Sequence, residues 1–306
     1  MDIQEIIDKM HQKKYLLGMG AGKLSKWFNT DRDTIYRAKS LTRKKLNRNR
    51  LPKILVFDIE TSPTISYTWG RFKENITIDK IEQDPIMLTW AAKWLFNPEV
   101  ISDAITPKEV LKFNDYRIVK SLWDIIDEAD ILIAHYGSGF DIPFLNYRAI
   151  VNGLNPPHTS NSIDTKKESS KTFKFPSNKL DALASYFEIE GKFSTNMSLW
   201  INCLKGNSDS IKEMLDYNIQ DVIVLEKVYL RLRPWIKGHI NTGLYIEEAD
   251  SICPSCGSKD IKLVGDYYTQ TGKYTTYRCK CGALSRERKS NYIKEFRQNL
   301  LTGVSK

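Results

Sequence analysis

The sequence predicts an α/β domain around a mixed sheet, with a helical module before it and a small cysteine-bearing module after it. Three observations lead to this prediction. Between residues 51 and 240, short apolar runs of the buried-strand type alternate with helical patterns. The first fifty residues are strongly basic, and four of the five cysteines follow residue 250. At 306 residues, the chain can hold one mid-sized core with smaller modules attached.

Composition excludes several classes of protein. Hydrophobic residues make up 41% and charged residues 27% of the chain, as in globular proteins, and no apolar run approaches the length of a membrane span. Transmembrane and fibrous proteins are therefore excluded, and no membrane partner is expected. The polar start, Met1 to Glu5, lacks the apolar core of an export signal, so a cytoplasmic location is expected. In a reducing cytosol, clustered cysteines favour metal binding over disulfides.

Charge is distributed unevenly along the chain. Residues 1–50 carry 13 Lys and Arg against 5 Asp and Glu, residues 51–244 carry 22 against 25, and residues 245–306 carry 11 against 7. Basic flanks around a slightly acidic centre favour a protein whose ends hold a polyanion and whose centre binds divalent metal. The alternative is that the basic ends only keep the protein soluble.

The N-terminal module, residues 1–50, is predicted to be helical. After a first helix, residues 24–37 match a helix-turn-helix, with a small residue at Ser25, a left-handed turn at Asn29 and an apolar position at Ile35. The second helix, from about Asp33, would expose side chains suited to a DNA groove or backbone, namely Arg32, Tyr36 and Arg37. A generic basic helical hairpin packed on the core is the alternative. The basic run 43–50 lacks periodicity and is predicted to be a linker.

The central domain, residues 51–240, is predicted from alternating strands and helices. A buried strand at Ile54–Phe57 ends in Asp58-Ile59-Glu60-Thr61. Further strands are expected at 86–93 and 131–134, and helices at 116–128, 143–151, 180–187 and 209–231.

Four carboxylates and one tyrosine fall at suggestive positions in this pattern. Asp58 and Glu60 share one face of a strand because side chains alternate, and such a pair is costly unless a cation lies between. Asp141 follows the strand 131–134 through a turn with Gly137 and Gly139. Tyr217 and Asp221 lie four residues apart and so share one face of a helix.

Asp-x-Glu, then Phe-Asp after a strand, then Tyr-x-x-x-Asp on a late helix resembles the tyrosine-bearing branch of the DEDD 3′-to-5′ exonuclease superfamily, which has a ribonuclease H-like fold. The resemblance covers about residues 51–235 and is strongest to phage and bacterial exonuclease domains related to the proofreading domain of family B DNA polymerases. It rests on these stretches: 57–61 (FDIET), 134–135 (AH), 140–145 (FDIPFL), 163–165 (IDT), 178–181 (NKLD) and 217–221 (YNIQD). Tyr136 departs from the pattern, because many relatives have an asparagine there.

This resemblance implies phosphodiester hydrolysis assisted by two Mg²⁺ or Mn²⁺ ions, which prefer oxygen ligands. Asp58 would bridge both ions, Glu60 and Asp221 would complete the first site, and Asp141 would hold the second directly or through water. Tyr217 would orient the attacking water. The alternative is a scaffold that has lost catalysis.

Neighbouring polar and aromatic residues admit less specific roles. Asp164 is either a helix cap or an assistant of the site, and Asp181 is expected to be structural or to support the ligands. His135 is expected to hydrogen-bond rather than to bind metal. Trp69, Trp90 and Trp94 are core residues unless exposed, in which case one could stack on a terminal base.

The C-terminal module, residues 245–306, contains two cysteine pairs, Cys253 with Cys256 and Cys279 with Cys281. Four thiolates predict one structural Zn²⁺ in a zinc ribbon with strands at 261–264 and 273–278. The second pair encloses one residue where relatives usually have two, and unpaired cysteines or a redox pair are the alternatives. Basic and aromatic residues suggest a nucleic-acid grip, with a solvated basic face as the alternative: Tyr274, Tyr277, Arg278, Lys280, Arg286, Arg288 and Lys289.

Together these features predict a metal-dependent 3′-to-5′ exonuclease that releases 5′-mononucleotides, with DNA favoured over RNA as its nucleic-acid partner. The resemblance suggests a stand-alone nuclease or proofreading subunit of phage or bacterial DNA replication or repair, with a replicative polymerase as a candidate partner. Two alternatives stay open. One is a non-catalytic DNA-binding regulator that uses the flanking modules, and the other is a structure-specific endonuclease on the same fold.

Overall fold

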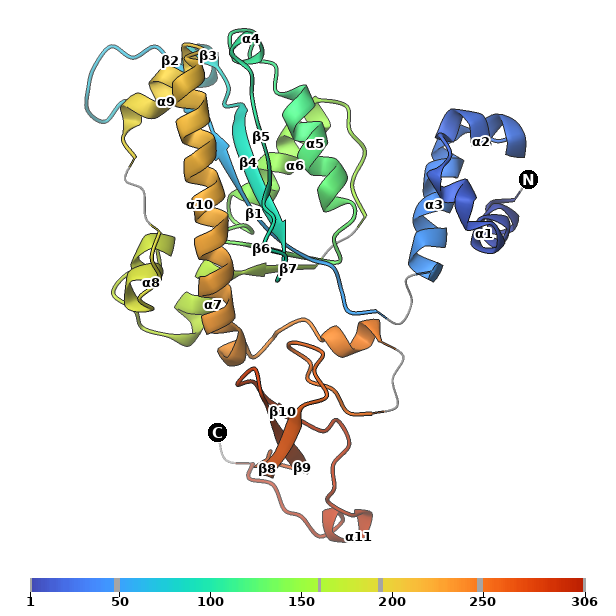
Figure 1. Cartoon of the computed structure of the whole chain (residues 1–306). Helices are drawn as coiled ribbons and strands as arrows, with labels where there is room; N and C mark the ends of the chain where they lie inside the picture. Colours follow the sequence, from blue (N-terminus) through green and yellow to red (C-terminus); the bar gives the residue numbers. More distant parts are fainter. Residues whose placement is uncertain (1, 47–49, 159–160, 192–194, 247–249, 305–306) are drawn as a thin grey trace. The chain divides into compact units, whose positions relative to one another are not determined.

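The computed structural model describes residues 2–46, 50–158, 161–191, 195–246 and 250–304 (Figure 1). The N-terminal helices and the central domain belong to different compact units, and each is described by itself. Within the described ranges, no helix combines the length and apolar character needed to cross a membrane.

The N-terminal unit has a small apolar core of its own. Its elements are α1 (Ile3–Gln12), the 3₁₀ helix η1 (Lys14–Gly18), α2 (Ala21–Phe28) and α3 (Arg32–Leu46). Ile6, Met10, Leu24 and Ile35 are fully buried against one another. Asn29 ends α2 at φ 49°, in the left-handed conformation predicted for the turn.

The linker prediction for residues 43–50 is wrong in its first half, because α3 continues to Leu46. Arg, Lys and Leu are good helix formers, and the buried Thr42 hydroxyl donates back to the Ala38 carbonyl at 2.7 Å instead of interrupting the helix. The missing apolar period therefore did not mark the end of the helix. Residues 47–49 lie outside the described residues.

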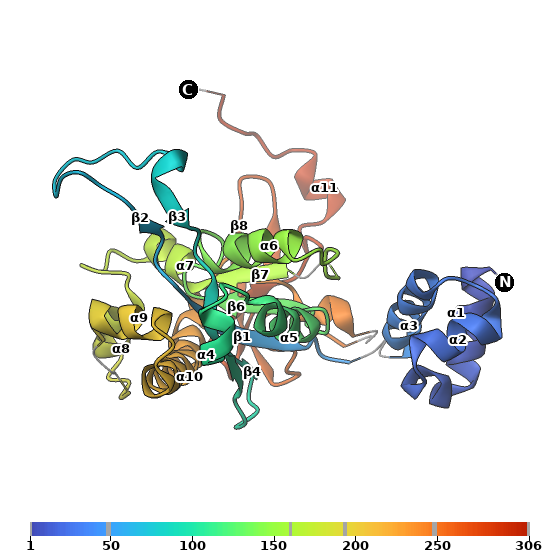
Figure 2. The same cartoon turned by 90° about the horizontal axis from the view of Figure 1, so that it is seen from above.

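The central domain is built on a five-stranded mixed sheet with the order β5-β4-β1-β6-β7 (Figures 1 and 2). Its strands are β1 (Ile54–Thr61), β4 (Met87–Trp94), β5 (Ile101–Ala104), β6 (Ile131–Ala134) and β7 (Asn161–Asp164). The pairs β4/β5 and β1/β4 are antiparallel, and β1/β6 and β6/β7 are parallel. The predicted mixed α/β sheet is confirmed. The two edge strands, β5 and β7, were not predicted.

The connecting helices are α4 (Pro107–Val110), α5 (Tyr116–Ile126), α6 (Asp141–Val151), α7 (Thr165–Thr172), α8 (Leu180–Tyr186), α9 (Met197–Leu204) and α10 (Ser208–Leu232), followed by the 3₁₀ helix η3 (Arg233–Trp235). The four predicted helices correspond to α5, α6, α8 and α10. Helix α10 starts at an N-cap, Asn207, whose side chain accepts the Ser210 amide at 2.9 Å.

Alternation along β1 and β4 gives the sheet two different faces. Leu55, Phe57 and Ile59 join the apolar cluster that includes residues of α5 and α6. Trp90 of β4 faces the same side, because its indole Nε1 donates to Ser121 of α5 at 3.1 Å. The intervening positions face α10, where the Thr89 hydroxyl donates to the Asn218 side chain at 3.1 Å. Asp58 and Glu60 lie on this α10 face.

Between β1 and β4 the chain forms a two-stranded hairpin, β2 (Ile65–Ser66) and β3 (Ile81–Gln83), with the 3₁₀ helix η2 (Ile78–Lys80) at its return. Ser62 and Ile86 close its base through two hydrogen bonds, of 2.9 Å between backbone groups and 3.0 Å from the Ile86 amide to the Ser62 hydroxyl.

The C-terminal segment contains the 3₁₀ helix η4 (Thr242–Tyr245), then β8 (Ile261–Tyr268), β9 (Lys273–Cys279) and β10 (Leu284–Arg286) in a sheet of order β10-β9-β8, and finally α11 (Lys294–Arg297). Both strands predicted here are confirmed, and both extend beyond the predicted ends.

Candidate active site

Three of the predicted carboxylates form one group. Asp58 and Glu60 on β1 and Asp221 on α10 each offer an oxygen, and these oxygens all lie within 4.8 Å of one another. β1 continues to Thr61, so both of its acids lie on the strand, on one face as predicted. The alternation of the strand therefore directs both carboxylates towards α10.

Asp141 lies beside this group without belonging to it. It is the first residue of α6, which begins two residues before the predicted start at 143, and its side chain is almost completely buried. Its Oδ1 accepts the Ile59 amide at 3.4 Å. The Asp141 carboxylate therefore lies against β1 at Ile59, the residue between Asp58 and Glu60. Its charge contributes to raising the pKa of both Asp58 and Glu60.

Without a bound cation, the ionised forms of the four acids are unfavourable. Burial, followed by repulsion from Asp141, Glu60 and Asp221, raises the pKa of Asp58 well above its usual value. Burial is also the main cause that raises the pKa of Glu60 to about 8, of Asp141 to about 7 and of Asp221 to about 6. Among the described residues, no lysine or arginine forms an ion pair with any of the four. Carboxylate oxygens grouped in this way fit a hard divalent cation.

Tyr217 and Asn218 of α10 hydrogen-bond to the carboxylates, Tyr217 within the helix and Asn218 across to β1. The Tyr217 hydroxyl hydrogen-bonds to Asp221, and burial followed by the charge of Asp221 raises the tyrosine pKa, so the phenol stays protonated. The fully buried Asn218 donates its Nδ2 to Asp58 Oδ2 at 2.7 Å and accepts from Thr89. Sequence reasoning missed Asn218. The available signal was its position three residues before Asp221, which puts both on one helical face.

The turn between β6 and α6 is held differently from the prediction. The left-handed residue is Tyr136, at φ 69°, a conformation that asparagine adopts more readily than tyrosine. Gly137 and Gly139 are needed for close approach instead. A Cβ on Gly137 would lie 2.4 Å from the Ala134 Cβ, and one on Gly139 would lie 2.4 Å from the Tyr136 ring. The Tyr136 amide donates to Asp164 Oδ1 at 3.0 Å, which fixes the turn.

Asp164 and His135 are structural supports of this turn. Asp164 caps α7 through the Lys167 amide at 3.1 Å and accepts the Ser138 hydroxyl at 2.6 Å. Burial alone would raise its pKa, but these hydrogen bonds outweigh burial and hold the pKa below the usual value. His135 hydrogen-bonds to Thr165 and Asn178, and burial lowers its pKa to about 4.

Among the remaining candidates, Asp181 on α8 lies close enough for its charge to contribute to the raised pKa of Asp221. The three tryptophans divide: Trp90 is buried in the core, Trp94 packs partly buried against it, and Trp69 is 97% exposed.

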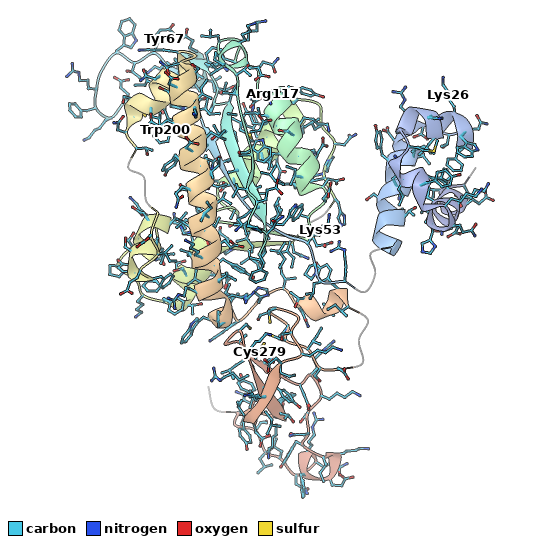
Figure 3. All side chains as sticks on the ribbon, in the orientation of Figure 1. Lys26, Lys53, Tyr67, Arg117, Trp200 and Cys279 are labelled. Carbon is cyan, nitrogen blue, oxygen red and sulfur yellow. The ribbon has the colours of Figure 1, made fainter. Side chains whose placement is uncertain are left out.

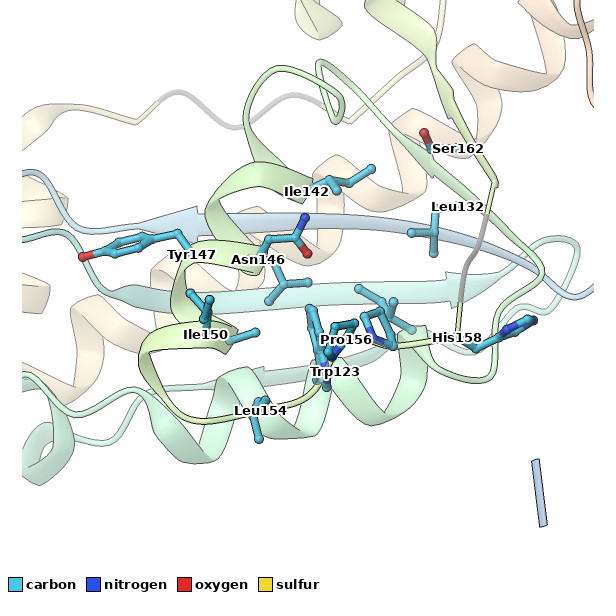
Figure 4. Close-up of a pocket in the computed structure, with 14 residues that line it drawn as sticks. Trp123, Leu132, Ile142, Asn146, Tyr147, Ile150, Leu154, Pro156, His158 and Ser162 are labelled. Carbon is cyan, nitrogen blue, oxygen red and sulfur yellow. The ribbon is translucent and has the colours of Figure 1, made fainter. Parts of the chain in front are cut away.

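A pocket of about 650 Å³ lies between α5, α6 and the end of β6 (Figure 4). Its lining is mostly apolar and includes Trp123, Leu132, Leu145, Ile150 and Leu154. None of the four carboxylates lines it. This pocket therefore belongs to the face of the sheet opposite the acids and has no part in their chemistry.

The four predicted cysteine ligands also come together. One sulfur atom from each of Cys253, Cys256, Cys279 and Cys281 lies within 4.8 Å of the other three; Cys279 is labelled in Figure 3. The two turns match despite their unequal lengths. Gly257 donates to the Cys253 carbonyl at 2.8 Å and Gly282 to the Cys279 carbonyl at 2.9 Å, and both glycines have positive φ. Four grouped thiols suit a tetrahedral Zn²⁺.

Comparison with known proteins supports the fold. A family model described as the RNase_H superfamily matches residues 104–233, less than half of the chain. The match includes Asp141, Tyr217 and Asp221 and begins after β1. The central fold is ribonuclease H-like. The family match favours a nuclease-type function for this domain in general terms.

Among solved structures, the chain is similar to the family B DNA polymerase from the hyperthermophilic archaeon Pyrobaculum calidifontis, with 14% sequence identity and a TM-score of 0.40. The alignment covers 60% of this chain and 26% of that chain, so it spans about a quarter of the polymerase. No curated protein matches the sequence.

Proposed function

We propose that the protein is a divalent-metal-dependent 3′-to-5′ exonuclease that releases 5′-mononucleotides from nucleic acid, with DNA as the favoured substrate. The observation that carries this proposal is the group formed by Asp58, Glu60 and Asp221, which are partly buried, repel one another and border on Asp141. Such a group is stable in its ionised form only with cations between the oxygens.

Asp58, Glu60 and Asp221 would hold one Mg²⁺ or Mn²⁺ ion, and Asp58 with Asp141 a second. Bound ions supply stabilisation for the negative charge that develops on phosphate oxygens during hydrolysis. The chain contributes the positioning: Asn218 fixes the orientation of Asp58 through its Nδ2. Tyr217 keeps its proton because its pKa is raised, so its hydroxyl is available to orient a water molecule beside Asp221.

The test is digestion of 5′-labelled single-stranded and duplex DNA and RNA oligonucleotides with Mg²⁺ or Mn²⁺. We expect a ladder that shortens from the 3′ end and disappears with EDTA and in Asp58→Ala. Asp216→Asn is the matched control, because Asp216 is an exposed acid on α10 next to Tyr217 and should leave the ladder unchanged. Intact oligonucleotides in every condition would contradict the proposal.

Closed circular single-stranded DNA separates the exonuclease from the endonuclease alternative. An enzyme that needs a 3′ end leaves circles intact while it degrades the linear form of the same sequence. Conversion of circles to linear molecules by the wild type, lost in Asp58→Ala, would favour the endonuclease.

We also propose that the N-terminal unit binds nucleic acid through α3. Tyr36 and Arg37 are exposed on this helix while Ile35 between the two helices is buried, as a recognition helix requires. Replacing Arg37 with alanine should weaken duplex binding and reduce the salt slope by about one. If binding depends on Arg37 but no substrate is cleaved, the DNA-binding regulator is the better description.

For the cysteine group we propose one structural Zn²⁺. Purified protein should contain about one equivalent of zinc, and Cys253→Ser should lose it together with the protection of this segment from proteolysis. Four thiols that react freely in the native protein, with no bound metal, would contradict this assignment.

A further inference from the structure

The hairpin between β1 and β4 carries aromatic side chains that the fold does not use. Trp69 is 97% exposed and Phe72 is 88% exposed. Among the described residues, neither ring contacts another aromatic ring or lies beneath a cation. Large apolar side chains placed in water are unfavourable unless a partner covers them. Their exposure therefore indicates a binding surface.

The hairpin is an ordered platform below these rings. Tyr67, labelled in Figure 3, is tied to Lys80 by a backbone hydrogen bond of 2.9 Å, and its hydroxyl hydrogen-bonds to Glu82, which raises the tyrosine pKa. Lys80 and Glu74 form an ion pair at 3.5 Å within the loop. Tyr67 thus serves the hairpin itself, and Trp69 and Phe72 are left to meet a ligand.

Charge at the tip selects the kind of ligand. Residues 69–73 read Trp-Gly-Arg-Phe-Lys, so the two aromatic side chains alternate with two cations and no acid. Arg71 and Lys73 are both exposed. Aromatic rings interleaved with cations are suited to single-stranded nucleic acid, whose bases stack on the rings while the phosphates approach the cations.

The position of the hairpin links it to the carboxylates. It leaves the sheet at Ser62, two residues after Glu60 on the same strand, and returns at Ile86 immediately before β4. Two extended residues span about 7 Å, so the base of the hairpin lies next to the acidic group. A strand bound with its end at Asp58 and Glu60 therefore meets the base of this hairpin, and the hairpin tip with residues 69–73 is the part of the same loop available to nucleotides farther from that end.

We propose that Trp69 and Phe72 form a stacking platform for unpaired bases upstream of the 3′ terminus, with Arg71 and Lys73 as phosphate contacts. The polarity of the bound strand rests on the proposed exonuclease function; the stacking itself does not. This platform makes a single-stranded 3′ segment the preferred substrate over a blunt duplex end, whose bases are already stacked on one another.

Binding tests the platform independently of catalysis. The anisotropy of a fluorescein-labelled oligo(dT) is measured with Mg²⁺ in an Asp58→Asn background, which prevents degradation. Trp69→Ala should raise Kd about five- to hundredfold, Phe72→Ala should act in the same direction, and Trp69→Phe should restore most of the affinity. Ile78→Ala is the matched control, because Ile78 is 89% exposed on the same hairpin but cannot stack, and it should leave Kd unchanged.

Activity then separates this inference from the proposed function. In the catalytic wild-type background, Trp69→Ala should raise KM for the oligonucleotide and leave hydrolysis of the p-nitrophenyl ester of thymidine 5′-phosphate unchanged, because that small substrate ends before the hairpin. A wild type that hydrolyses neither substrate would overturn the exonuclease only. An unchanged Kd in both Trp69→Ala and Phe72→Ala would overturn the platform, and would assign the exposed rings to a protein partner instead.

Discussion

Two groups of carboxylates in the central domain differ in how their negative charge is balanced. Asp115, at the start of α5, is 1% exposed and faces Arg148 of α6, whose Nε and Nη2 donate at 2.7 and 2.8 Å. The Met87 amide at 2.9 Å and Asn152 at 3.1 Å complete its hydrogen bonds. The group of Asp58, Glu60 and Asp221 receives no such cation from the described residues, and its pKa values rise instead.

This contrast separates a structural acid from a functional one without knowledge of the reaction. At Asp115 the chain itself supplies the positive charge and the donors, so the carboxylate holds α5, α6 and β4 together. At the acidic group the described residues supply Asn218 as a donor to Asp58 but no ion-paired lysine or arginine, so a bound cation is the expected source of the balancing charge. Removing one acid should therefore have opposite effects on stability at the two places.

The largest expected effect is on catalysis at the acidic group. Asp58→Asn should lower kcat by about 10³-fold or more, because the carboxylates act as a unit. In EDTA at pH 8 the same variant should melt at a higher temperature than the wild type, since one of the repelling charges is gone. Oligonucleotide digestion measures the loss of activity, and thermal unfolding measures the change in melting temperature. A variant that loses activity and also melts at a lower temperature than the wild type in EDTA would contradict the inference that the Asp58 charge destabilises the metal-free protein.

At the structural pair, Arg148→Met should lower the free energy of unfolding by about 3–5 kcal/mol, because Asp115 is left charged and buried. Lys120→Met is the matched control: it breaks the exposed pair with Asp124 on α5 and should cost less than about 0.5 kcal/mol. Urea unfolding measures both. Equal losses in the two variants would mean that Arg148 acts through packing rather than charge.

The sequence predicted the acidic group but not the pair of Asp115 and Arg148, and the reason is physical. Asp58 with Glu60 and Tyr217 with Asp221 have local spacing, and the period of a strand or helix puts each pair on one face before any tertiary structure is known. Asp115 and Arg148 are separated by 33 residues and joined by no motif, so their pairing exists only once α5 and α6 pack. Asn218 falls between the two cases, since its helical face was predictable but its partner on β1 was not.

The strands and helices also divide into those that the local sequence pattern predicted and those that it did not. The central strands β1, β4 and β6 were predicted because their continuous apolar runs are buried on both faces. The edge strand β7 was missed because two of its four residues are exposed, and the last turn of α3 because the basic sequence there has no apolar period. The helix after β6 was predicted from residue 143 and begins at Asp141, and the positive φ of the turn before it belongs to Tyr136 rather than to a glycine.

A smaller effect on catalysis is expected from replacing Tyr217, the uncharged residue of the site. Tyr217→Phe should lower kcat by about 10²-fold with little change in KM, because the hydroxyl that orients water is lost while the carboxylates remain. The affinity for Mg²⁺, measured by the stabilisation that the ion confers on unfolding, should stay within about threefold. A loss of Mg²⁺ affinity equal to the loss of kcat would show that Tyr217 instead holds Asp221 in place.

The smallest expected effect is a dependence of stability on pH that magnesium removes. The pKa values of Glu60 and Asp141 are raised to about 8 and about 7, so the folded protein retains protons that the unfolded chain releases. Without metal, stability should therefore fall as pH rises from 6.5 to 8, by about 2 kcal/mol if one extra proton is held. His135, whose pKa is lowered, opposes this trend only below about pH 6.5.

Saturating Mg²⁺ should flatten this slope, because the ion binds the ionised carboxylates and takes the place of the retained protons. Urea unfolding at three pH values in this window, in EDTA and in Mg²⁺, gives both slopes. Glu60→Gln should also flatten the EDTA slope, and Asp216→Asn, on the exposed face of α10, should leave it as in the wild type. Parallel slopes with and without Mg²⁺ would mean that the retained protons belong to groups outside the acidic cluster. The inference that this cluster, unlike Asp115, lacks a balancing cation in the metal-free protein would then be wrong.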